Sequence, residues 1–220
     1  MALAGSKLSP RPFVEFAQAF SETELLRALR FLQGNFESEL QSFTPVTKFS
    51  LKGDDAALAD YEWLVAKMLD LAASANREGE WQLESGPLRP TDEMTYDRFG
   101  PSFSDVKFDW HCDDDDRGPR DISVVAYFTD PSEYEGGELQ IQLPAGLRID
   151  ADQEASCSSS DTQLESGMTN SDQVVIHRSF GRGDAVAFPS KFLRHRVTPV
   201  VAGERRSLLM LCSSRETQGW

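Results

Sequence analysis

Short runs of β-forming residues follow one another through residues 80–213, and breaks rich in Gly, Pro or Asp separate them. The runs are Trp81–Glu84, Glu93–Phe99, Val106–Cys112, Ile122–Thr129, Glu138–Leu143, Gln173–His177, Ala185–Phe188, Arg196–Val200 and Arg206–Cys212. Strands this short and this closely spaced are typical of a β-sandwich or barrel. The pattern argues against a parallel α/β sheet, whose strands need long crossover connections between them.

The stretch before these runs has a different period and is predicted to be mostly helical. Ser21 and Glu24 form a capping box in front of leucines that repeat at helical spacing. A second helix is predicted to begin near Asp54–Asp55 and to end before Gly79, with apolar residues along one face.

The chain is expected to form a single domain, 1–220, in which the helical stretch 1–79 supports the β-rich stretch 80–213. The segment at about 150–172 nearly lacks large apolar residues and is rich in Ser, Asp, Gln, Glu and Thr. Such a segment cannot bury enough apolar surface to offset its ordering entropy. We therefore predict a mobile polar insertion there, either a lid or a disordered loop.

Composition and charge exclude several classes of protein. A formal net charge of −14 argues against an extended phosphate-binding surface, so no nucleic-acid partner is expected. The sequence has no apolar run of about 18 residues and no apolar signal region, so we expect no membrane span and a cytoplasmic location. Cys112, Cys157 and Cys212 are odd in number and widely spaced, which favours free thiols in a reducing compartment.

Two of the three histidines are candidate metal ligands. His111 and Asp113 are two residues apart on a predicted strand, so their side chains point to one face and can meet at one ion. His195, after another turn-and-strand pattern, supplies a third ligand. Two His and one carboxylate suit non-heme Fe(II), although Zn²⁺ accepts the same residue types. His177 has no carboxylate two residues on and is interpreted as structural.

Arg205 and Ser207 form a second candidate site. Gly203 permits a tight turn before them, and a spacing of two puts both side chains on one face of a strand. A guanidinium beside a hydroxyl is a good receptor for a carboxylate. The alternative interpretation is a surface arginine beside Arg206.

Several motifs occur in a fixed order along the β-rich stretch. They are His111-x-Asp113, Glu135-Gly136-Gly137-Glu138-Leu139, Gly183-Asp184-Ala185-Val186-Ala187-Phe188-Pro189, His195-Arg196-Val197-Thr198-Pro199-Val200 and Arg205. In this order they resemble the Fe(II)/2-oxoglutarate dioxygenases, most of all the prolyl-4-hydroxylase-like branch, over about residues 94–213. The resemblance implies a mainly β fold with N-terminal helices: a double-stranded β-helix (jelly-roll) core with the helices packed on one sheet.

The resemblance also implies a role for each candidate residue. The implied iron ligands, which are also the catalytic residues, are His111, Asp113 and His195. Arg205 would bind the distal carboxylate of 2-oxoglutarate, and the further candidates for cofactor binding are Ser207, Tyr127 and Tyr96. The implied cofactors are Fe(II), 2-oxoglutarate and O₂, with ascorbate as a candidate reductant. The implied reaction hydroxylates a C–H bond, of a prolyl residue or another amino-acid side chain, and releases succinate and CO₂.

Two other functions stay open at this point. One is a metal-dependent β-barrel enzyme that does not use 2-oxoglutarate, and the other is a non-catalytic binding or sensor module. The expected substrate is a small molecule or a peptide. Asp114–Asp116 directly follow Asp113 and are either a solvated acidic turn or an attractor for a cationic substrate. The sequence leaves the oligomeric state open.

Overall fold

The computed structural model shows a mainly β protein, with two α-helices in the part of the chain that it describes. The described residues are 11–36, 46–48, 55–81, 83, 86–91, 94–101, 108–113, 119–143 and 174–214. The helices are α1 (Glu22–Phe36) and α2 (Asp55–Glu78). The strands are β1 (Val14–Phe16), β2 (Val46–Lys48), β3 (Arg89–Pro90), β4 (Thr95–Phe99), β5 (Phe108–His111), β6 (Ile122–Tyr127), β7 (Tyr134–Gly136), β8 (Leu139–Leu143), β9 (Val174–Arg178), β10 (Ala185–Pro189), β11 (Arg194–Val197), β12 (Val200–Gly203) and β13 (Arg205–Ser213).

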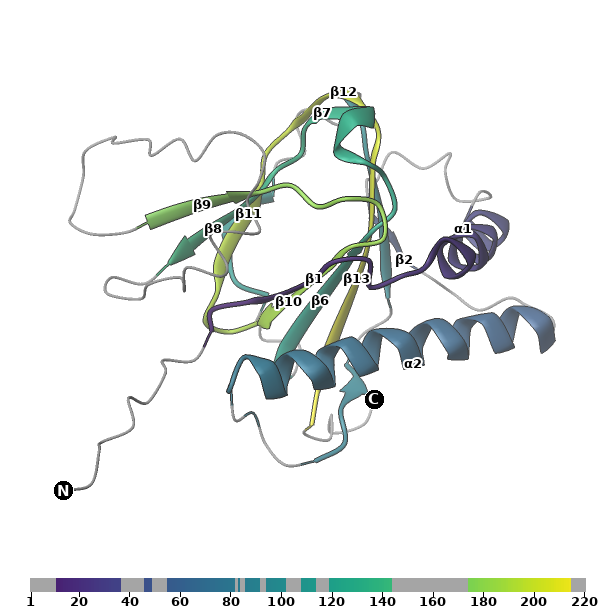
Figure 1. The fold of residues 1–220 in the computed structure, drawn as a ribbon, viewed down its shortest axis with the longest axis horizontal. Helices are drawn as coiled ribbons and strands as arrows, with labels where there is room; N and C mark the ends of the chain where they lie inside the picture. The colour runs from purple at the N-terminus through teal and green to yellow at the C-terminus, as the bar shows by residue number, and fades with distance from the viewer. Residues whose placement is uncertain are drawn as a thin grey trace.

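These strands form two main sheets in which every pairing is antiparallel (Figure 1). The large sheet has the order β1-β10-β6-β13-β4-β2, and β3 also pairs with β13. The small sheet has the order β5-β11-β8-β9, and β12 pairs with β7 in a separate ribbon. In Figure 1, α2 runs across the lower ends of β6 and β13, and it contacts both of these strands and β10.

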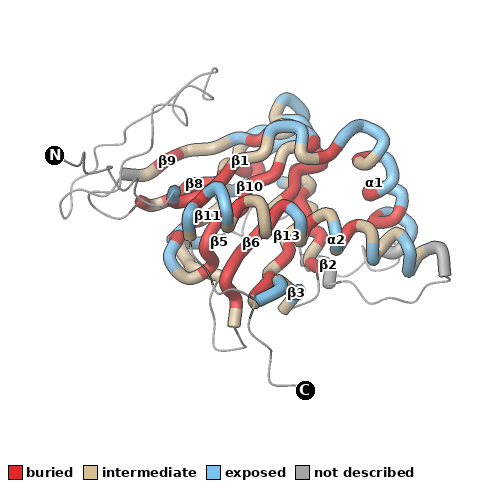
Figure 2. Tube along the Cα trace, turned by 60° about the horizontal axis from the view of Figure 1, so that its bottom comes forward, coloured by how far each residue is buried: buried red, intermediate tan, exposed pale blue. Residues whose placement is uncertain are grey.

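Two apolar cores lie on the two faces of the large sheet. The helix-side core lies between this sheet and the helices, and it includes Leu64, Met68, Val124, Leu208 and Met210. The inter-sheet core lies between the two sheets, and it includes Tyr127, Leu139, Ile141, Val186 and Phe188. Because successive side chains of a strand point to opposite faces, the central strands contribute to both cores. Figure 2 shows buried residues concentrated along β10, β6 and β13.

Both predicted helices are present, and α1 begins with the predicted capping box. The backbone N–H of Ser21 donates to Oε2 of Glu24 at 2.8 Å, and Ser21 Oγ accepts from the backbone N–H of Glu24 at 3.4 Å. α2 begins at Asp55 and ends at Glu78, just before Gly79, as the sequence predicts.

The prediction that residues 1–79 are mostly helical omits two strands. β1 pairs with β10 and β2 pairs with β4, so these strands form the two edges of the large sheet. Each has three residues, which is too short for an alternation of apolar and polar side chains to be recognised in one sequence.

The predicted strand Arg196–Val200 is two strands, because β11 ends at Val197 and β12 begins at Val200. Pro199 lies between them and has no backbone N–H to donate to a sheet. β11 and β12 therefore pair with different partners, β8 and β7 respectively.

Trp81 and Leu83, which were expected in a strand, are outside any strand. Both pack against the helix-side core, and the indole N–H of Trp81 donates to the carbonyl of Arg11 at 2.5 Å. Burial of these side chains thus explains their apolar character without a sheet.

Three sequence predictions lie outside the described residues: the polar insertion 150–172, the acidic turn Asp114–Asp116, and Cys157. The described cysteines, Cys112 and Cys212, form no disulfide. In the described ranges, no helix is long and apolar enough to cross a membrane.

The helix-side core predicts a difference between two leucines of α2. Leu64 is 0% exposed, whereas Leu58 is 42% exposed. Replacing Leu64 by Ala removes buried methyl groups and leaves a cavity, so we expect the free energy of unfolding to fall by about 2–5 kcal/mol. Leu58→Ala is the matched control and should change it by less than about 0.5 kcal/mol. Denaturant titration measures both, and equal losses would contradict the packing described above.

Candidate active site

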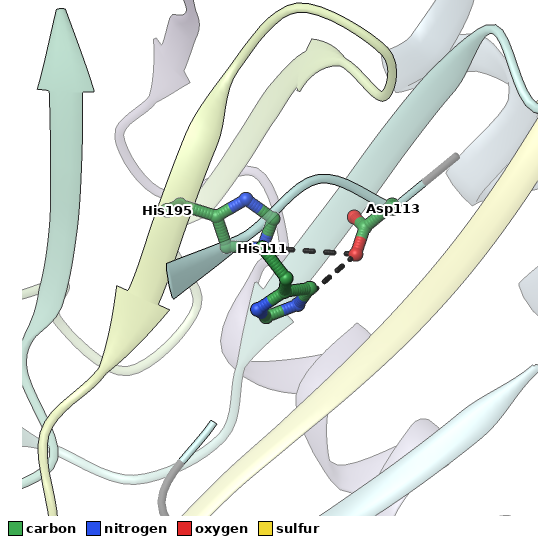
Figure 3. A group of neighbouring side chains, drawn as sticks. All are labelled: His111, Asp113 and His195. Carbon is green, nitrogen blue, oxygen red and sulfur yellow. Dashed lines mark ion pairs between the residues drawn. The ribbon is translucent and has the colours of Figure 1, made fainter. Parts of the chain in front are cut away.

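Three side chains predicted to bind a metal lie together between the two sheets. His111 ends β5, Asp113 lies two residues beyond it, and His195 lies on β11, where the register pairs it with His111. One potential ligand atom from each of the three lies within 4.8 Å of the others (Figure 3). Oδ1 of Asp113 is 3.4 Å from Nε2 of His111 and 3.7 Å from Nε2 of His195. A single ion can therefore contact all three residues.

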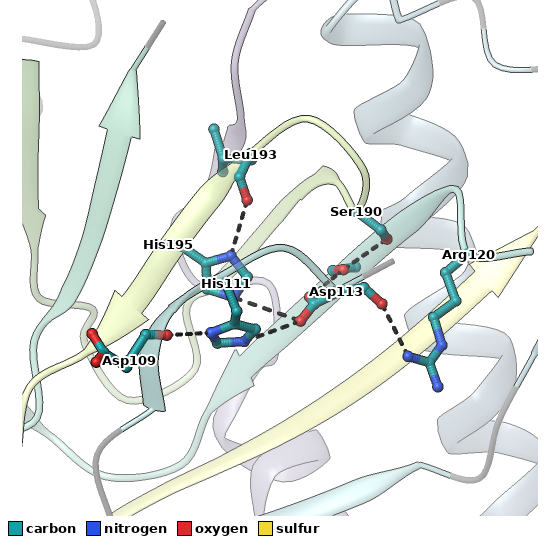
Figure 4. A network of polar contacts seen from close by, with 8 residues as sticks. Asp109, His111, Asp113, Arg120, Ser190, Leu193 and His195 are labelled. Carbon is teal, nitrogen blue, oxygen red and sulfur yellow. Dashed lines mark hydrogen bonds and ion pairs between the residues drawn. The ribbon is translucent and has the colours of Figure 1, made fainter. Parts of the chain in front are cut away.

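Backbone carbonyls determine which ring nitrogen of each histidine faces Asp113. Nδ1 of His111 is 2.7 Å from the carbonyl oxygen of Asp109, and Nδ1 of His195 is 3.1 Å from that of Leu193 (Figure 4). Since a carbonyl only accepts hydrogen bonds, each Nδ1 carries a hydrogen. In the neutral rings, both Nε2 lone pairs then point toward the carboxylate, which is the arrangement that a cation needs.

In the absence of a metal ion, the electrostatics of the three side chains favour an ionised Asp113 and a proton on His111. The hydrogen bond with Asp113 raises the pKa of His111, whereas burial lowers the pKa of His195. Burial opposes ionisation of Asp113, but contacts with His111, His195 and Ser123 outweigh it and lower the pKa of Asp113. Asp113 is thus held as an anion next to two imidazoles.

Asp113 is oriented by residues that the sequence did not single out as functional. Ser123 Oγ, on β6, donates to Oδ2 of Asp113 at 2.5 Å and lies 2.8 Å from Ser190 Oγ. The backbone N–H of Asp113 donates to the carbonyl of Ser190 at 3.0 Å, and Arg120 Nη1 donates to the carbonyl of Asp113 at 3.0 Å. These bonds attach the segment after β5 to the large sheet and turn Oδ1 toward the histidines.

A second polar cluster lies on the same face of the large sheet as Ser123. In the register of the central strands, Ser207 is opposite both Tyr127 and Asp97, and Arg205 is opposite Phe99. Residues directly opposite in antiparallel strands share a face, and Tyr127 is four residues from Ser123 on β6. The predicted residues Arg205, Ser207 and Tyr127 therefore lie together, and Asp97 joins them.

Arg205 is a buried charge in an aromatic enclosure. It is only 3% exposed, and its guanidinium carbon lies 5.0 Å from the ring centre of Tyr127 and 5.6 Å from that of Phe99. Nη1 donates to Ser207 Oγ at 3.0 Å. Within the described ranges, its Nε has no hydrogen-bond partner and it forms no ion pair. A buried charge without a counter-ion is unfavourable, so this pocket favours an anionic ligand.

Tyr127 adds a neutral hydroxyl to this pocket. It is 2% exposed, its ring stacks on Phe180 with 4.6 Å between ring centres, and its hydroxyl interacts with the Arg205 guanidinium. Burial raises the pKa of Tyr127 to about 12, ahead of the opposing effect of Arg205. The hydroxyl therefore keeps its proton at neutral pH and can donate it to a ligand oxygen.

A glycine turn limits the space around Arg205. Gly137, between β7 and β8, has a φ of +65°, which L side chains rarely adopt. A Cβ at this position would lie 2.9 Å from Cδ of Arg205 and 2.9 Å from Cγ2 of Val200. The turn can approach the arginine stem only because residue 137 has no side chain.

The prediction that Tyr96 contributes to cofactor binding is corrected by its place in the sheet. Tyr96 belongs to the helix-side core, where its ring lies 6.3 Å from that of Phe128. It is opposite Leu208, not Ser207, so it points away from Arg205. A shift of one residue along a strand changes the face, and Asp97 occupies the pocket face instead.

The alternative that Arg205 is a surface residue is likewise wrong. Arg206 is the more exposed neighbour, and its Nε donates to Glu204 at 2.5 Å.

His177 lies on the face of the small sheet opposite to the one that carries His195. It is paired with Gln140, and its Nδ1 lies 3.0 Å from Oε2 of Glu138. It is not part of the group of candidate ligands.

Comparison with known proteins identifies the family. A sequence model of the 2OG-Fe(II) oxygenase superfamily matches residues 95–211, just over half of the chain. The chain belongs to this superfamily. No curated protein matches the chain at a significant level.

Solved structures of 2OG-Fe(II) oxygenases have the same fold. The chain is similar to a prolyl-4-hydroxylase from Pseudomonas putida (18% identity, 94% of each chain covered, TM-score 0.59). It is similar to a Trichoplax adhaerens prolyl hydroxylase solved with a hypoxia-inducible-factor peptide fragment (13% identity, 93% of this chain and 84% of that chain, TM-score 0.59). It also resembles a non-heme alpha-ketoglutarate-dependent carbocyclase from nogalamycin biosynthesis (13% identity, 92% and 79%, TM-score 0.59).

Membership of the 2OG-Fe(II) oxygenases agrees with the site. The superfamily implies Fe(II), 2-oxoglutarate and O₂ as cofactors. A His-Asp-His group with its lone pairs turned inward is suitable for Fe(II), and a buried arginine without an ion pair in the described part of the chain is suitable for a carboxylate. The oxygenase is thus an Fe(II)- and 2-oxoglutarate-dependent hydroxylase by family and by donor chemistry.

The candidate ligand group predicts which histidines matter for iron. His111→Ala, Asp113→Ala and His195→Ala should each remove iron binding and turnover and leave a folded protein, because each variant removes one of three donors. His177→Ala is the matched control and should keep both. Iron per chain is measured by elemental analysis after Fe(II) loading. Unchanged iron content and activity in any one of the three variants would refute the assignment.

The hydrogen bond to Asp113 predicts a smaller effect at Ser123. Ser123→Ala removes the donor to Oδ2 while all three candidate ligands stay in place. Loss of a group that orients a ligand typically weakens metal affinity by about 10–100-fold. Competition with a chelator measures this change, and Ser132→Ala, at an exposed site, is the control. A wild-type affinity in Ser123→Ala would mean that this bond does not orient the ligand.

Proposed function

We propose that His111, Asp113 and His195 hold the iron of this hydroxylase and that Arg205 binds the distal carboxylate of 2-oxoglutarate. The observation that carries the proposal is the burial of the Arg205 guanidinium, which forms no ion pair among the described residues. It lies on the same face of the large sheet as Ser123, the residue that holds Asp113. The anion pocket and the candidate iron ligands are therefore parts of one site.

Each residue of the pocket has a role that follows from its chemistry. Arg205 supplies the counter-charge, Ser207 holds its guanidinium through Nη1, and Tyr127 offers a neutral hydroxyl. Phe99 and Tyr127 exclude water from the pocket, which strengthens the charge–charge contact. When bound, iron and 2-oxoglutarate supply the oxidising chemistry with O₂, and succinate and CO₂ are released. Ascorbate is proposed as the reductant.

The arrangement of the sheets supports a finer proposal for the fold. We propose that the large and small sheets form a double-stranded β-helix, with α2 as the support of the large sheet. The contacts of α2 with β6, β10 and β13 support this topology, as do the two cores on the two faces of the large sheet. In this arrangement the residues of the site lie on short strands whose other side chains are packed in the apolar cores.

The proposed substrate is a C–H bond of a peptide side chain, with a prolyl residue first among the candidates, or of a small molecule. A Pseudomonas putida prolyl-4-hydroxylase and a Trichoplax adhaerens enzyme solved with a peptide support the first class. The carbocyclase from nogalamycin biosynthesis supports the second. The net charge of −14 supports a cationic substrate in either class.

The experiment for the proposed function measures succinate formed from 2-oxoglutarate. The protein is loaded with Fe(II) and supplied with O₂ and a panel of prolyl peptides, basic peptides and free amino acids. We expect succinate to form only when Fe(II) is present. We expect its yield to be highest with the member of the panel that is the true substrate. Iron binding without use of 2-oxoglutarate would indicate another metal enzyme, and absence of both would indicate a binding module.

Arg205 gives the sharpest single-residue prediction. Arg205→Ala should raise the Kd for 2-oxoglutarate by roughly 30- to several thousand-fold, since losing one partner of a desolvated charge pair costs about 2–5 kcal/mol. Iron binding should stay, and Arg205→Lys should not restore full affinity, because an ammonium has no planar fork. Arg206→Ala is the matched control on the other face of β13. Equal affinity in wild type and Arg205→Ala would exclude the proposed role.

A further inference from the structure

The pocket around Arg205 contains a buried carboxyl group that is neither one of the three candidate metal ligands nor ion-paired with the arginine in the described structure. Asp97 lies at the centre of β4, opposite Ser207 on β13 and Val46 on β2. The residue is 9% exposed, and its Oδ1 has no hydrogen-bond partner among the described residues. A carboxylate buried in this way needs either a counter-charge or a proton.

The two charged residues that act on Asp97 have opposite effects on its pKa. Arg205 on β13 favours the anion, and Asp113 after β5 disfavours it, but neither is ion-paired with Asp97 in the described structure. Burial dominates both and raises the pKa of Asp97 to about 7. Tyr127 on β6 is neutral, and on β2 the residue at the register position opposite Thr95 is Lys48. Close to neutral pH, Asp97 is therefore divided between its two protonation states.

An incoming dicarboxylate changes this balance in one direction. Its distal carboxylate would take the Arg205 guanidinium as its partner, which screens the positive charge that favours the ionised form of Asp97. The dicarboxylate would also add a negative charge to the one that Asp113 already places near Asp97. Both effects favour a proton on Asp97, and a protonated carboxyl group can donate a hydrogen bond that a carboxylate cannot.

We propose that Asp97 is a second recognition group of the cosubstrate pocket, which takes up a proton when 2-oxoglutarate binds and donates a hydrogen bond to it beside Arg205. The proton comes from solvent, so one proton and one dicarboxylate enter together. This inference rests on the proposed function, because it assumes that Arg205 binds 2-oxoglutarate. It makes Asp97 a binding residue and assigns it no part in the oxidation.

The proposal predicts in which direction the Kd for 2-oxoglutarate changes with pH. Well below the pKa of Asp97 the carboxyl group already holds its proton, so the affinity for 2-oxoglutarate does not change through this group. Above that pKa the proton must be captured from solvent, so the Kd rises with pH, by up to about tenfold for each pH unit. Asp97→Asn replaces the carboxyl by a neutral donor of the same shape, so its Kd should be nearly constant across this range.

The test is isothermal titration calorimetry of 2-oxoglutarate into the Fe(II)-loaded protein under argon, from pH 6.5 to pH 9. Repeating each titration in buffers of different ionisation enthalpy gives the number of protons taken up. At pH 8.5 we expect close to one proton for wild type and none for Asp97→Asn. Glu204→Gln is the matched control: it removes one carboxylate from the Arg98–Glu204–Arg206 cluster outside the pocket and should behave as wild type.

The outcomes separate this inference from the proposed function. A wild-type protein that binds 2-oxoglutarate without proton uptake at pH 8.5 overturns the role of Asp97, and this result needs no variant to fold. Equal proton uptake in wild type and Asp97→Asn overturns it as well. So does weaker binding by a folded Asp97→Asn at every pH, which would show that the ionised carboxylate is the form required. No binding to wild type at any pH would refute the proposed function itself.

Discussion

The burial of a full positive charge on β13 is the constraint on which the site depends. Arg205 is almost inaccessible to solvent, and its guanidinium lies beside two aromatic rings and the Ser207 hydroxyl, without an ion pair in the described part of the chain. A charge buried in this way is unfavourable unless an opposite charge or hydrogen bonds compensate for its lost hydration. The strand that carries it must therefore be well supported. The other face of β13 provides this support, because Leu208 and Met210 are fully buried against the helix-side core. The helices thus support the strand that carries Arg205.

The candidate metal group depends on the same large sheet through a different contact. His111 and His195 belong to the small sheet, but Asp113 is held by Ser123 and Ser190, which extend from β6 and β10. The group therefore joins the two sheets at one point. Its geometry requires the sheets to keep their separation, which the inter-sheet core determines through residues such as Ile141 and Phe188.

The sequence allowed predictions about residues that are close together in the chain, but not about residues that only the pairing of strands brings together. Arg205 with Ser207 was predictable because two residues spaced by two share a face of a strand. His111 and Asp113 also lie together, although β5 ends at His111. Asp97 and Ser123 were not selected, because their importance arises from cross-strand register, which one sequence does not contain. Tyr96 was placed wrongly for the same reason. It is next to Asp97 in the chain, but its side chain points to the opposite face of β4. The ligand and arginine assignments stay predictions until they are measured.

The turn at Gly136 and Gly137 has a consequence for how this enzyme could be altered. Both residues have positive φ, and a Cβ at either position would collide with the neighbouring chain, at Gly136 with the carbonyl of Pro199. A laboratory library that varies the proposed cosubstrate pocket should therefore keep this pair fixed and diversify β4, at Phe99 and Asp97. The glycine turn leaves no room for a side chain beside the stem of Arg205, so the space around its guanidinium can be altered only through the other residues of the proposed pocket.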